Sequence, residues 1–236
     1  MRVFSDIHLV DGVSCNVYII VEPEGVTIVD AGMPGAEKRI LAALQTIGRS
    51  PRDVRHILVT HQHVDHIGGL AALVEATGAE TWAHPGDTPA IEGRAQREAP
   101  HGPLGLVFRA ALFPRLRPAT ITHTVGERAV VPVLSGEGGL QVVETLGHTM
   151  GHISFYLPRR KLLFAGDAVR TERGRILPPP AMVSYDMPLA LQSVRKLAAM
   201  DIAACLPGHG APVTQGAQAL LAAQAGGAGS TVVSRS

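Results

Sequence analysis

The chain has 236 residues with a formal charge of +1, and 46% of them are hydrophobic, which is enough for a sizeable core. The balance of 21 basic and 20 acidic residues argues against a general nucleic-acid-binding surface, so we expect no such partner. Residues 1–6 lack a long apolar run of the secretory kind, and no run reaches the roughly 18 residues of a membrane span. We therefore expect a cytoplasmic protein with no membrane partner.

The first third of the chain alternates strand-like and helix-like segments. Short apolar runs are separated by Gly, Pro and Asp turn residues, and longer runs carry one apolar face at helical spacing. The predicted segments are strands at 2–8, 15–21 and 26–30, a helix at 34–47, a strand at 56–59, a helix at 67–77 and a strand at 80–84. This alternation predicts an α/β core.

Residues 85–125 differ from this pattern. A short helix is predicted at 87–97, and an apolar run at 104–113 lies between two prolines. This segment is a possible capping insertion whose apolar run we expect to line a pocket, with Leu106 and Phe108 contacting an apolar part of a substrate. The alternative is a helix packed on the core.

Strand patterns return after this segment. The predicted elements are strands at 129–134, 140–145, 152–157 and 161–165, an irregular loop at 170–186, a helix at 188–200, a strand at 202–206 and a short helix near 215–224. The histidine-containing segments described below extend from residue 61 to residue 209, so a domain boundary between them would divide one site. We therefore predict a single domain over 1–225 and a disordered tail at 226–236.

The most informative stretch is 60–69, where His61, His63, Asp65 and His66 lie within six residues. It follows a strand-like run and precedes a helix-like run, so it occupies a strand-to-helix turn. Alternate residues of an extended segment point the same way, and the turn can bring the other two side chains beside them. Imidazole nitrogens and carboxylate oxygens suit zinc or a similar first-row metal.

This stretch resembles the signature of the metallo-β-lactamase-fold superfamily, in the general branch near lactonases and glyoxalase II-like hydrolases. Further segments resemble that family's pattern in the same order along the chain. They are Ile28-Val29-Asp30-Ala31-Gly32, Gly147-His148-Thr149-Met150-Gly151-His152, Phe164-Ala165-Gly166-Asp167 and Leu206-Pro207-Gly208-His209-Gly210. The resemblance implies a four-layer αββα sandwich, in which two mixed β-sheets pack face to face with helices outside.

The resemblance also implies a site with two divalent metal ions, with zinc expected and iron or manganese as alternatives. His61, His63 and His148 would hold the first metal, Asp65, His66 and His209 the second, and Asp167 would bridge both. Asp65 and Asp167 are then the catalytic carboxylates, Asp65 as a candidate to handle the proton of a bridging water. The implied activity is hydrolysis of a small-molecule ester, lactone or thioester by a metal-bridging hydroxide.

Other polar residues have candidate roles outside the ligand set. Asp30 is expected to orient a ligand histidine, and Tyr185 could donate a hydrogen bond to an oxyanion of the substrate. His152 is predicted to be a structural hydrogen-bonding residue. Cys15 and Cys205 are interpreted as core thiols, with a disulfide left open.

Departures from named branches of the family leave the substrate open. Acyl-homoserine lactonases often carry a tyrosine three residues after the bridging aspartate, where this chain has Arg170. The glycine-rich stretch and helical extension of glyoxalase II enzymes are poorly matched here. Iron-dependent redox enzymes of the same fold, such as persulfide dioxygenases, and phosphodiesterases remain alternatives, and the oligomeric state is open, a dimer included.

Overall fold

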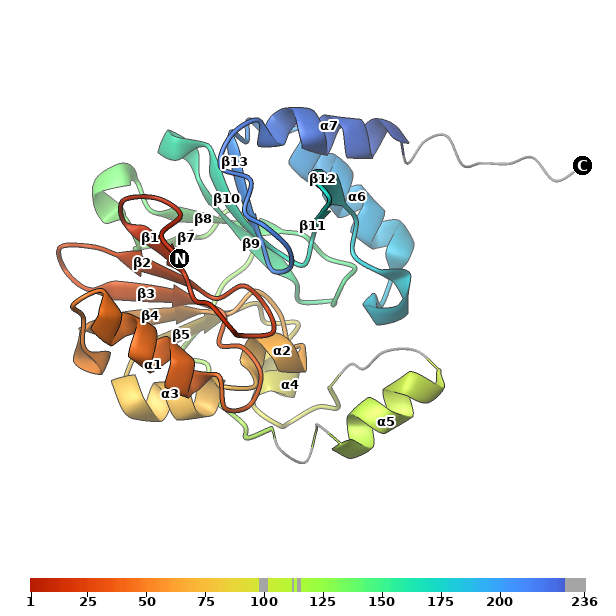
Figure 1. The fold of residues 1–236 in the computed structure, drawn as a ribbon. Helices are drawn as coiled ribbons and strands as arrows, with labels where there is room; N and C mark the ends of the chain where they lie inside the picture. Colours follow the sequence, from red (N-terminus) through yellow and green to blue (C-terminus); the bar gives the residue numbers. More distant parts are fainter. Residues whose placement is uncertain (98–101, 112, 114–115, 228–236) are drawn as a thin grey trace, which may run out of the picture.

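A computed structural model describes residues 1–97, 102–111, 113 and 116–227 of the chain. Two β-sheets pack face to face, and helices cover the outer face of each sheet (Figure 1). The predicted α/β sandwich of two mixed sheets with outer helices is confirmed. The single-domain boundary at 1–225 stays a prediction.

The first sheet has six strands in the order β1-β2-β3-β4-β5-β6. Pairing is antiparallel from β1 to β3 and parallel from β3 to β6. The strands are β1 (Ile7–Leu9), β2 (Tyr18–Val21), β3 (Val26–Val29), β4 (Val54–Leu58), β5 (Glu80–Ala83) and β6 (His123–Thr124).

The second sheet has five strands in the order β13-β10-β9-β8-β7, with β13 parallel to β10 and the other pairs antiparallel. Its strands are β7 (Val130–Val131), β8 (Leu140–Glu144), β9 (Ile153–Leu157), β10 (Leu162–Gly166) and β13 (Ala204–Pro207). A separate hairpin pairs β11 (Arg170–Glu172) with β12 (Arg175–Leu177).

Helices α1 (Glu37–Thr46) and α3 (Leu70–Thr77) cover the first sheet, and α6 (Met187–Ala198) and α7 (Ala217–Gly227) cover the second (Figure 1). Two short helices, α2 (Val64–Ile67) and α4 (Thr88–Ile91), lie near one edge of the sandwich. Helix α5 (Pro103–Ala111) stands apart from both sheets in the same view. None of the helices in the described ranges is long and apolar enough to cross a membrane.

The alternation of strand side chains explains the layers. In β2, Tyr18 and Ile20 belong to the core between the sheets, whereas Ile19 belongs to the core beneath α1 and α3. In β10, Phe164 joins the inner core and Leu163 packs beneath α6 and α7. The rings of Tyr18 and Phe164 meet edge to face at 5.6 Å across the sheets. Strands buried on both faces carry continuous apolar runs, so these strands can be predicted from the sequence.

The prediction of an irregular loop at 170–186 is wrong for its first part, where β11 and β12 form a hairpin. Arg173 and Gly174 form the turn with positive φ angles of 49° and 73°, which suits a two-residue hairpin connection. The strands of this hairpin are too short and polar to show a clear alternating pattern. The predicted helix at 87–97 is also too long, because α4 ends at Ile91.

Two further expectations concern the cysteines and the tail. Cys15 and Cys205 are free and buried, so the interpretation as core thiols is confirmed. Of the predicted tail, residues 226 and 227 form the end of α7, and residues 228–236 lie outside the described residues.

Candidate metal centre

Four loops meet at one edge of the sandwich. The first, 59–63, follows β4 and leads into α2, and the second, 145–152, joins β8 to β9. The third and fourth follow the ends of β10 and β13, which are parallel neighbours and therefore deliver their loops to the same edge. These loops and α2 carry all the predicted ligands, namely His61, His63, Asp65, His66, His148, Asp167 and His209.

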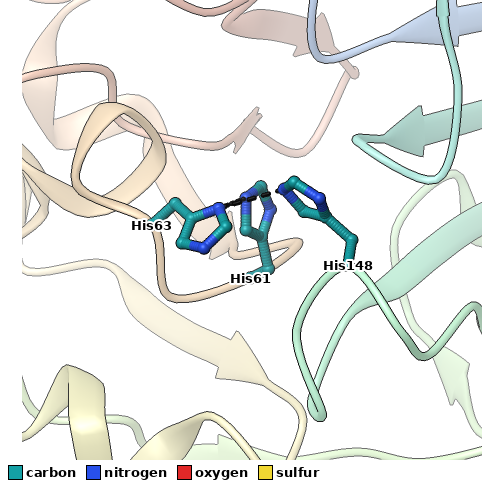
Figure 2. Close-up of side chains that lie close together, drawn as sticks. All are labelled: His61, His63 and His148. Atoms are coloured by element: carbon teal, nitrogen blue, oxygen red, sulfur yellow. Dashed lines mark hydrogen bonds between the residues drawn. The ribbon is translucent and has the colours of Figure 1, made fainter. Parts of the chain in front are cut away.

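The first cluster contains three histidines whose rings converge, as Figure 2 shows. The Nδ1 atom of His63 lies 3.1 Å from Nε2 of His61 and 3.0 Å from Nε2 of His148. His61 and His148 are buried, and His63 is half-buried. Three imidazole nitrogens this close together could hold a metal ion.

The second cluster contains Asp65, His66 and His209, whose ligand atoms lie within 4.8 Å of one another. The Oδ2 atom of Asp65 is 3.1 Å from Nε2 of His209 and 3.8 Å from Nε2 of His66. This mixed set of nitrogen and oxygen donors could also hold a metal ion.

Asp167 lies between the two clusters. Its Oδ2 atom is 3.4 Å from Nε2 of His148 in the first cluster and 3.4 Å from Nε2 of His209 in the second. Its Oδ1 atom is 3.4 Å from Nε2 of His66. A single carboxylate therefore touches both groups of candidate ligands.

The hydrogen bonding of these groups fits a cation. Among the described residues, Nε2 of His66 and Oδ1 of Asp167 are buried and have no hydrogen-bond partner. Buried polar atoms are nearly always paired, so two such atoms facing each other at a histidine cluster require an explanation. A divalent ion bound between them would satisfy both, and the donor set therefore fits a metal.

Electrostatics favour the metal-binding protonation states in the first cluster and at Asp167. Burial, with the neighbouring histidines, holds the pKa of His61 well below its ordinary value. Burial and the nearby His148 lower the pKa of His63 to about 3. Burial opposes ionisation of Asp167, but His66 and His148 outweigh it and keep its pKa well below the usual range. Neutral imidazoles and an ionised carboxylate are the forms that bind metals. In the second cluster, burial opposes protonation of His66 and His209, but neighbouring acidic groups outweigh it and raise the pKa of both.

Asp30 lies behind the second cluster. Its Oδ2 atom is 2.8 Å from Nδ1 of His66, so this ring nitrogen donates to the carboxylate and Nε2 faces the cluster. Asp30 also accepts hydrogen bonds from the backbone N–H and the hydroxyl of Thr60. The Thr60 hydroxyl is 3.0 Å from Nδ1 of His61. These contacts agree with the expected orienting role, which stays a prediction.

His152 makes two structural hydrogen bonds behind the ligands. Its Nε2 atom accepts from the backbone N–H of Asp167 at 2.9 Å, and its Nδ1 atom lies 2.8 Å from the Thr145 hydroxyl. Both ring nitrogens are therefore used within the protein, as expected for a structural histidine.

Asp87 is a buried residue of this region that sequence reasoning missed. Its carboxylate accepts from the backbone N–H of Gln62 at 2.8 Å and from the Thr149 hydroxyl at 2.7 Å. It therefore connects the loop of His61 and His63 to the loop of His148. The sequence shows only an aspartate before a short helix, a position where aspartate is ordinary.

Asn16 was missed in the same way. Its side-chain amide donates to the backbone carbonyls of Pro207 at 2.9 Å and Gly210 at 2.7 Å. The hydroxyl of Tyr18 donates to the same Pro207 carbonyl at 2.9 Å. These bonds hold the turn that carries His209, and no local sequence signal could have identified them.

A cavity of about 470 Å³ opens over both clusters. The wall of this cavity is mostly apolar, and it also contains several of the candidate ligands. The lining residues are Ser14, Met33, His63, Val64, Asp65, Phe113, His148, Asp167, Arg170, Pro179, Pro180, Val183 and His209. The segments expected to shape a pocket, 100–117 and 170–186, both contribute to this wall.

Two of the residues predicted to contact substrate, Leu106 and Tyr185, are absent from the described lining of this cavity. Leu106 is 70% exposed and Tyr185 is 61% exposed. The side chain of Phe108 lies outside the described part of the structure. Their assignment as substrate residues stays a prediction.

Comparison with known families agrees with this geometry. The sequence profile of the metallo-beta-lactamase superfamily matches residues 10–209. The chain belongs to the metallo-beta-lactamase superfamily. The matched range ends at His209, so it includes every candidate ligand.

Several curated relatives of this superfamily member are hydrolases by name. The probable metallo-hydrolase YflN of Bacillus subtilis is 31% identical, over 84% of this chain and 81% of that protein. A hydroxyacylglutathione hydrolase of Rhodospirillum rubrum is 28% identical, over 86% of this chain and 66% of that enzyme. An N-acyl homoserine lactonase from Bacillus sp. is 28% identical, over 76% of this chain and 73% of that enzyme.

A solved structure supports the fold. The metallo-beta-lactamase family protein TTHA1429 from Thermus thermophilus superposes with a TM-score of 0.74 at 21% identity. The superposition covers 97% of this chain and 81% of that protein. The two chains therefore share the complete sandwich.

Proposed function

We propose that this superfamily member is a metal-dependent hydrolase that cleaves an ester, lactone or thioester bond in a small molecule. The observation that carries the proposal is the position of Asp167 between two clusters of candidate ligands in the lining of a largely apolar cavity. Concave, mostly apolar cavities with a few convergent polar groups are the usual form of small-molecule sites.

The ligand assignment follows the two clusters. His61, His63 and His148 would hold one divalent ion, Asp65, His66 and His209 the other, and Asp167 would contact both. Zinc is the expected ion, because imidazole and carboxylate donors suit it. Ions bound there would supply an activated water as nucleophile and polarise the carbonyl of the substrate.

The protein's own groups would manage protons and water. The carboxylate of Asp65 lines the cavity. Burial opposes its ionisation, but His66 and a hydrogen bond from His209 outweigh burial and lower its pKa to about 2. It is therefore ionised at neutral pH and able to accept the proton of an attacking water. Met33, Val64 and Phe113 would exclude bulk water from the reacting bond.

The names of the relatives support the choice of substrate class. One relative is named as a hydrolase of hydroxyacylglutathione and another as a lactonase of an N-acyl homoserine. Both substrates are acylated small molecules. We infer that this chain acts on the same general class.

The test combines metal analysis with a substrate panel. The purified protein, reconstituted with zinc, would be assayed with esters, lactones, thioesters and phosphodiesters, and its metal content measured by elemental analysis. We expect about two ions per chain and hydrolysis of at least one carboxylic substrate, lost on chelation and restored by zinc. Hydrolysis of phosphodiesters alone would overturn the proposal. Iron-dependent oxygen consumption without hydrolysis would do the same.

A further inference from the structure

Arg170 gives the cavity a positively charged side chain. Among the described lining residues, it is the sole lysine or arginine. The other charged lining groups are the candidate ligands, which would be occupied by metal ions. The guanidinium is thus the cationic side chain of the cavity lining that could bind an anionic group of a ligand.

The hydrogen bonds of Arg170 leave part of this group unsatisfied. Its Nη1 atom donates to Oε2 of Glu172 at 2.5 Å, and the Glu172 side chain is 48% exposed. Its Nε atom is shielded from solvent and has no hydrogen-bond partner in the described part of the chain. A buried donor without an acceptor costs stability, so the side chain would gain a hydrogen bond by turning this donor toward an acceptor in the cavity that Arg170 lines.

The backbone holds Arg170 in a fixed position relative to the candidate metal centre. In the β11–β12 hairpin, Arg170 pairs with Leu177. The backbone N–H of Thr171 donates to the carbonyl of His209 at 3.0 Å. Gly210 packs so closely on this strand that an added Cβ would lie 2.0 Å from the Thr171 carbonyl oxygen. The backbone of Arg170 is therefore fixed beside the last ligand loop, which limits the entropic cost of binding to ordering of the side chain.

We propose that Arg170 binds a carboxylate on the substrate, so that the preferred substrate has an apolar body with an anionic group besides the bond to be cleaved. The apolar part would pack against Phe113, Pro179 and Val183, which line the same cavity. A guanidinium recognises a carboxylate through paired N–H donors. This inference rests on the proposed hydrolase function and names the substrate class for the same site.

The kinetic test uses pairs of substrates that differ in one group. Monoesters of a straight-chain dicarboxylic acid would be compared with the corresponding esters that end in a primary amide. We expect the wild-type protein to favour the carboxylate by at least about 10-fold in kcat/KM. In Arg170→Gln, kcat/KM for the carboxylate should fall about 10- to 100-fold, mainly through KM, and change less than about 3-fold for the amide.

Two other variants separate a specific contact from a general charge effect. Arg175→Gln removes the same charge from the exposed neighbouring strand β12 and should leave the preference unchanged. Glu172→Gln removes the competing negative charge and should keep or increase the preference. An unchanged preference in Arg170→Gln, or an equal loss in Arg175→Gln, would overturn the inference.

A binding measurement keeps this inference distinct from the proposed activity. Isothermal calorimetry would compare suberate with suberate monoamide on the metal-loaded protein, so that only the second carboxylate differs. We expect suberate to bind about 10-fold more tightly to wild type and equally with its monoamide to Arg170→Gln. If no ester, lactone or thioester is hydrolysed, the proposed function fails. The comparison of suberate with its monoamide still tests whether Arg170 binds a carboxylate. Equal affinities in wild type would overturn the anion site.

Discussion

The carboxylate of Asp30 orients groups on two neighbouring segments. It accepts from the Thr60 backbone and hydroxyl, and it lies 2.8 Å from Nδ1 of His66. The N–H of a ligand histidine bonded to a carboxylate fixes the tautomer and the direction of the ring. A single residue outside the candidate ligand set would therefore control how His66 presents its Nε2 atom to the second cluster.

Asp30→Asn should weaken metal binding without unfolding the protein. Asparagine has the same shape and tolerates the φ of 63° at this position, but its neutral amide orients His66 less well. We expect metal affinity to fall about 10- to 100-fold, measured by competition with a chromophoric chelator. Asp201→Asn, at an exposed pair with Lys161, is the matched control and should bind metal normally. Wild-type affinity in Asp30→Asn would contradict the orienting role.

Asp167→Asn should remove more metal than the loss of a ligand from one cluster. Asp167 contacts His148 in the first cluster and His209 in the second, so its carboxylate would neutralise charge at both positions. We expect the substituted protein to retain less than about one ion per chain by elemental analysis, and His209→Ala to retain about one. Two retained ions in Asp167→Asn would rule out a shared ligand.

At the scale of elements, buried side-chain hydrogen bonds hold the loops together. Asp87 precedes α4 and accepts hydrogen bonds from Gln62 in one ligand loop and Thr149 in another. Burial raises the pKa of Asp87, although these hydrogen bonds oppose the shift. The relative position of the two loops therefore depends on a carboxylate that is not among the candidate metal ligands.

Asp87→Ala should destabilise the fold and loosen the first cluster. The substitution removes the carboxylate that accepts from the Gln62 backbone N–H and the Thr149 hydroxyl, at a cost of about 1–3 kcal/mol for each lost bond. We expect the free energy of unfolding in urea to fall by about 3 kcal/mol, with weaker metal binding. Thr149→Val removes one of these bonds and should cost about 1 kcal/mol. Equal losses in the two variants would show that Asp87 does not act through both loops.

At the scale of the whole molecule, an ion network connects the two sheets away from the candidate site. Arg160, in the turn between β9 and β10, pairs with Glu137 in the turn between β7 and β8. It also donates to both carboxylate oxygens of Asp6, before β1, at 2.9 and 2.7 Å. Hydrogen bonding from Arg160 lowers the pKa of Glu137 below 4.5.

Arg160→Met should reduce stability at neutral pH and less so in acid. Because the folded-state pKa of Glu137 is lowered, its pairing stabilises the fold above pH 4.5 and is lost as pH falls through the lowered value. The partners are nearly one-third exposed, so we expect a loss of only about 1 kcal/mol at pH 7. Urea unfolding at pH 7 and at about pH 3 should show a smaller difference from wild type in acid. If the free energies of unfolding of wild type and Arg160→Met differ equally at both pH values, the ion pair is not the cause of the difference.

Local sequence patterns predicted an α/β core and the first candidate ligands, whereas the resemblance to the superfamily implied the four-layer sandwich and the further ligands His148, Asp167 and His209. Strands such as β9 and β10 are buried on both faces, so their apolar runs are visible without any knowledge of their partners. The spacing of His61, His63, Asp65 and His66 is likewise local, because a strand-to-helix turn alone brings these side chains together. The polar hairpin β11–β12 carried no such pattern and was missed.

Tertiary structure alone decided what surrounds the ligands. Asp87 contacts a residue 25 positions before it and another 62 positions after it, and Asn16 contacts Gly210, 194 positions away. The cavity wall likewise combines Phe113, Arg170 and Pro179 from separate segments, whereas Leu106 and Tyr185 lie outside it. Such contacts form only after the sheets pack and the loops close. No local pattern in the sequence therefore indicates that these side chains are in contact. The sequence therefore predicted the candidate metal ligands, and packing selected the residues that contact these ligands and line the cavity.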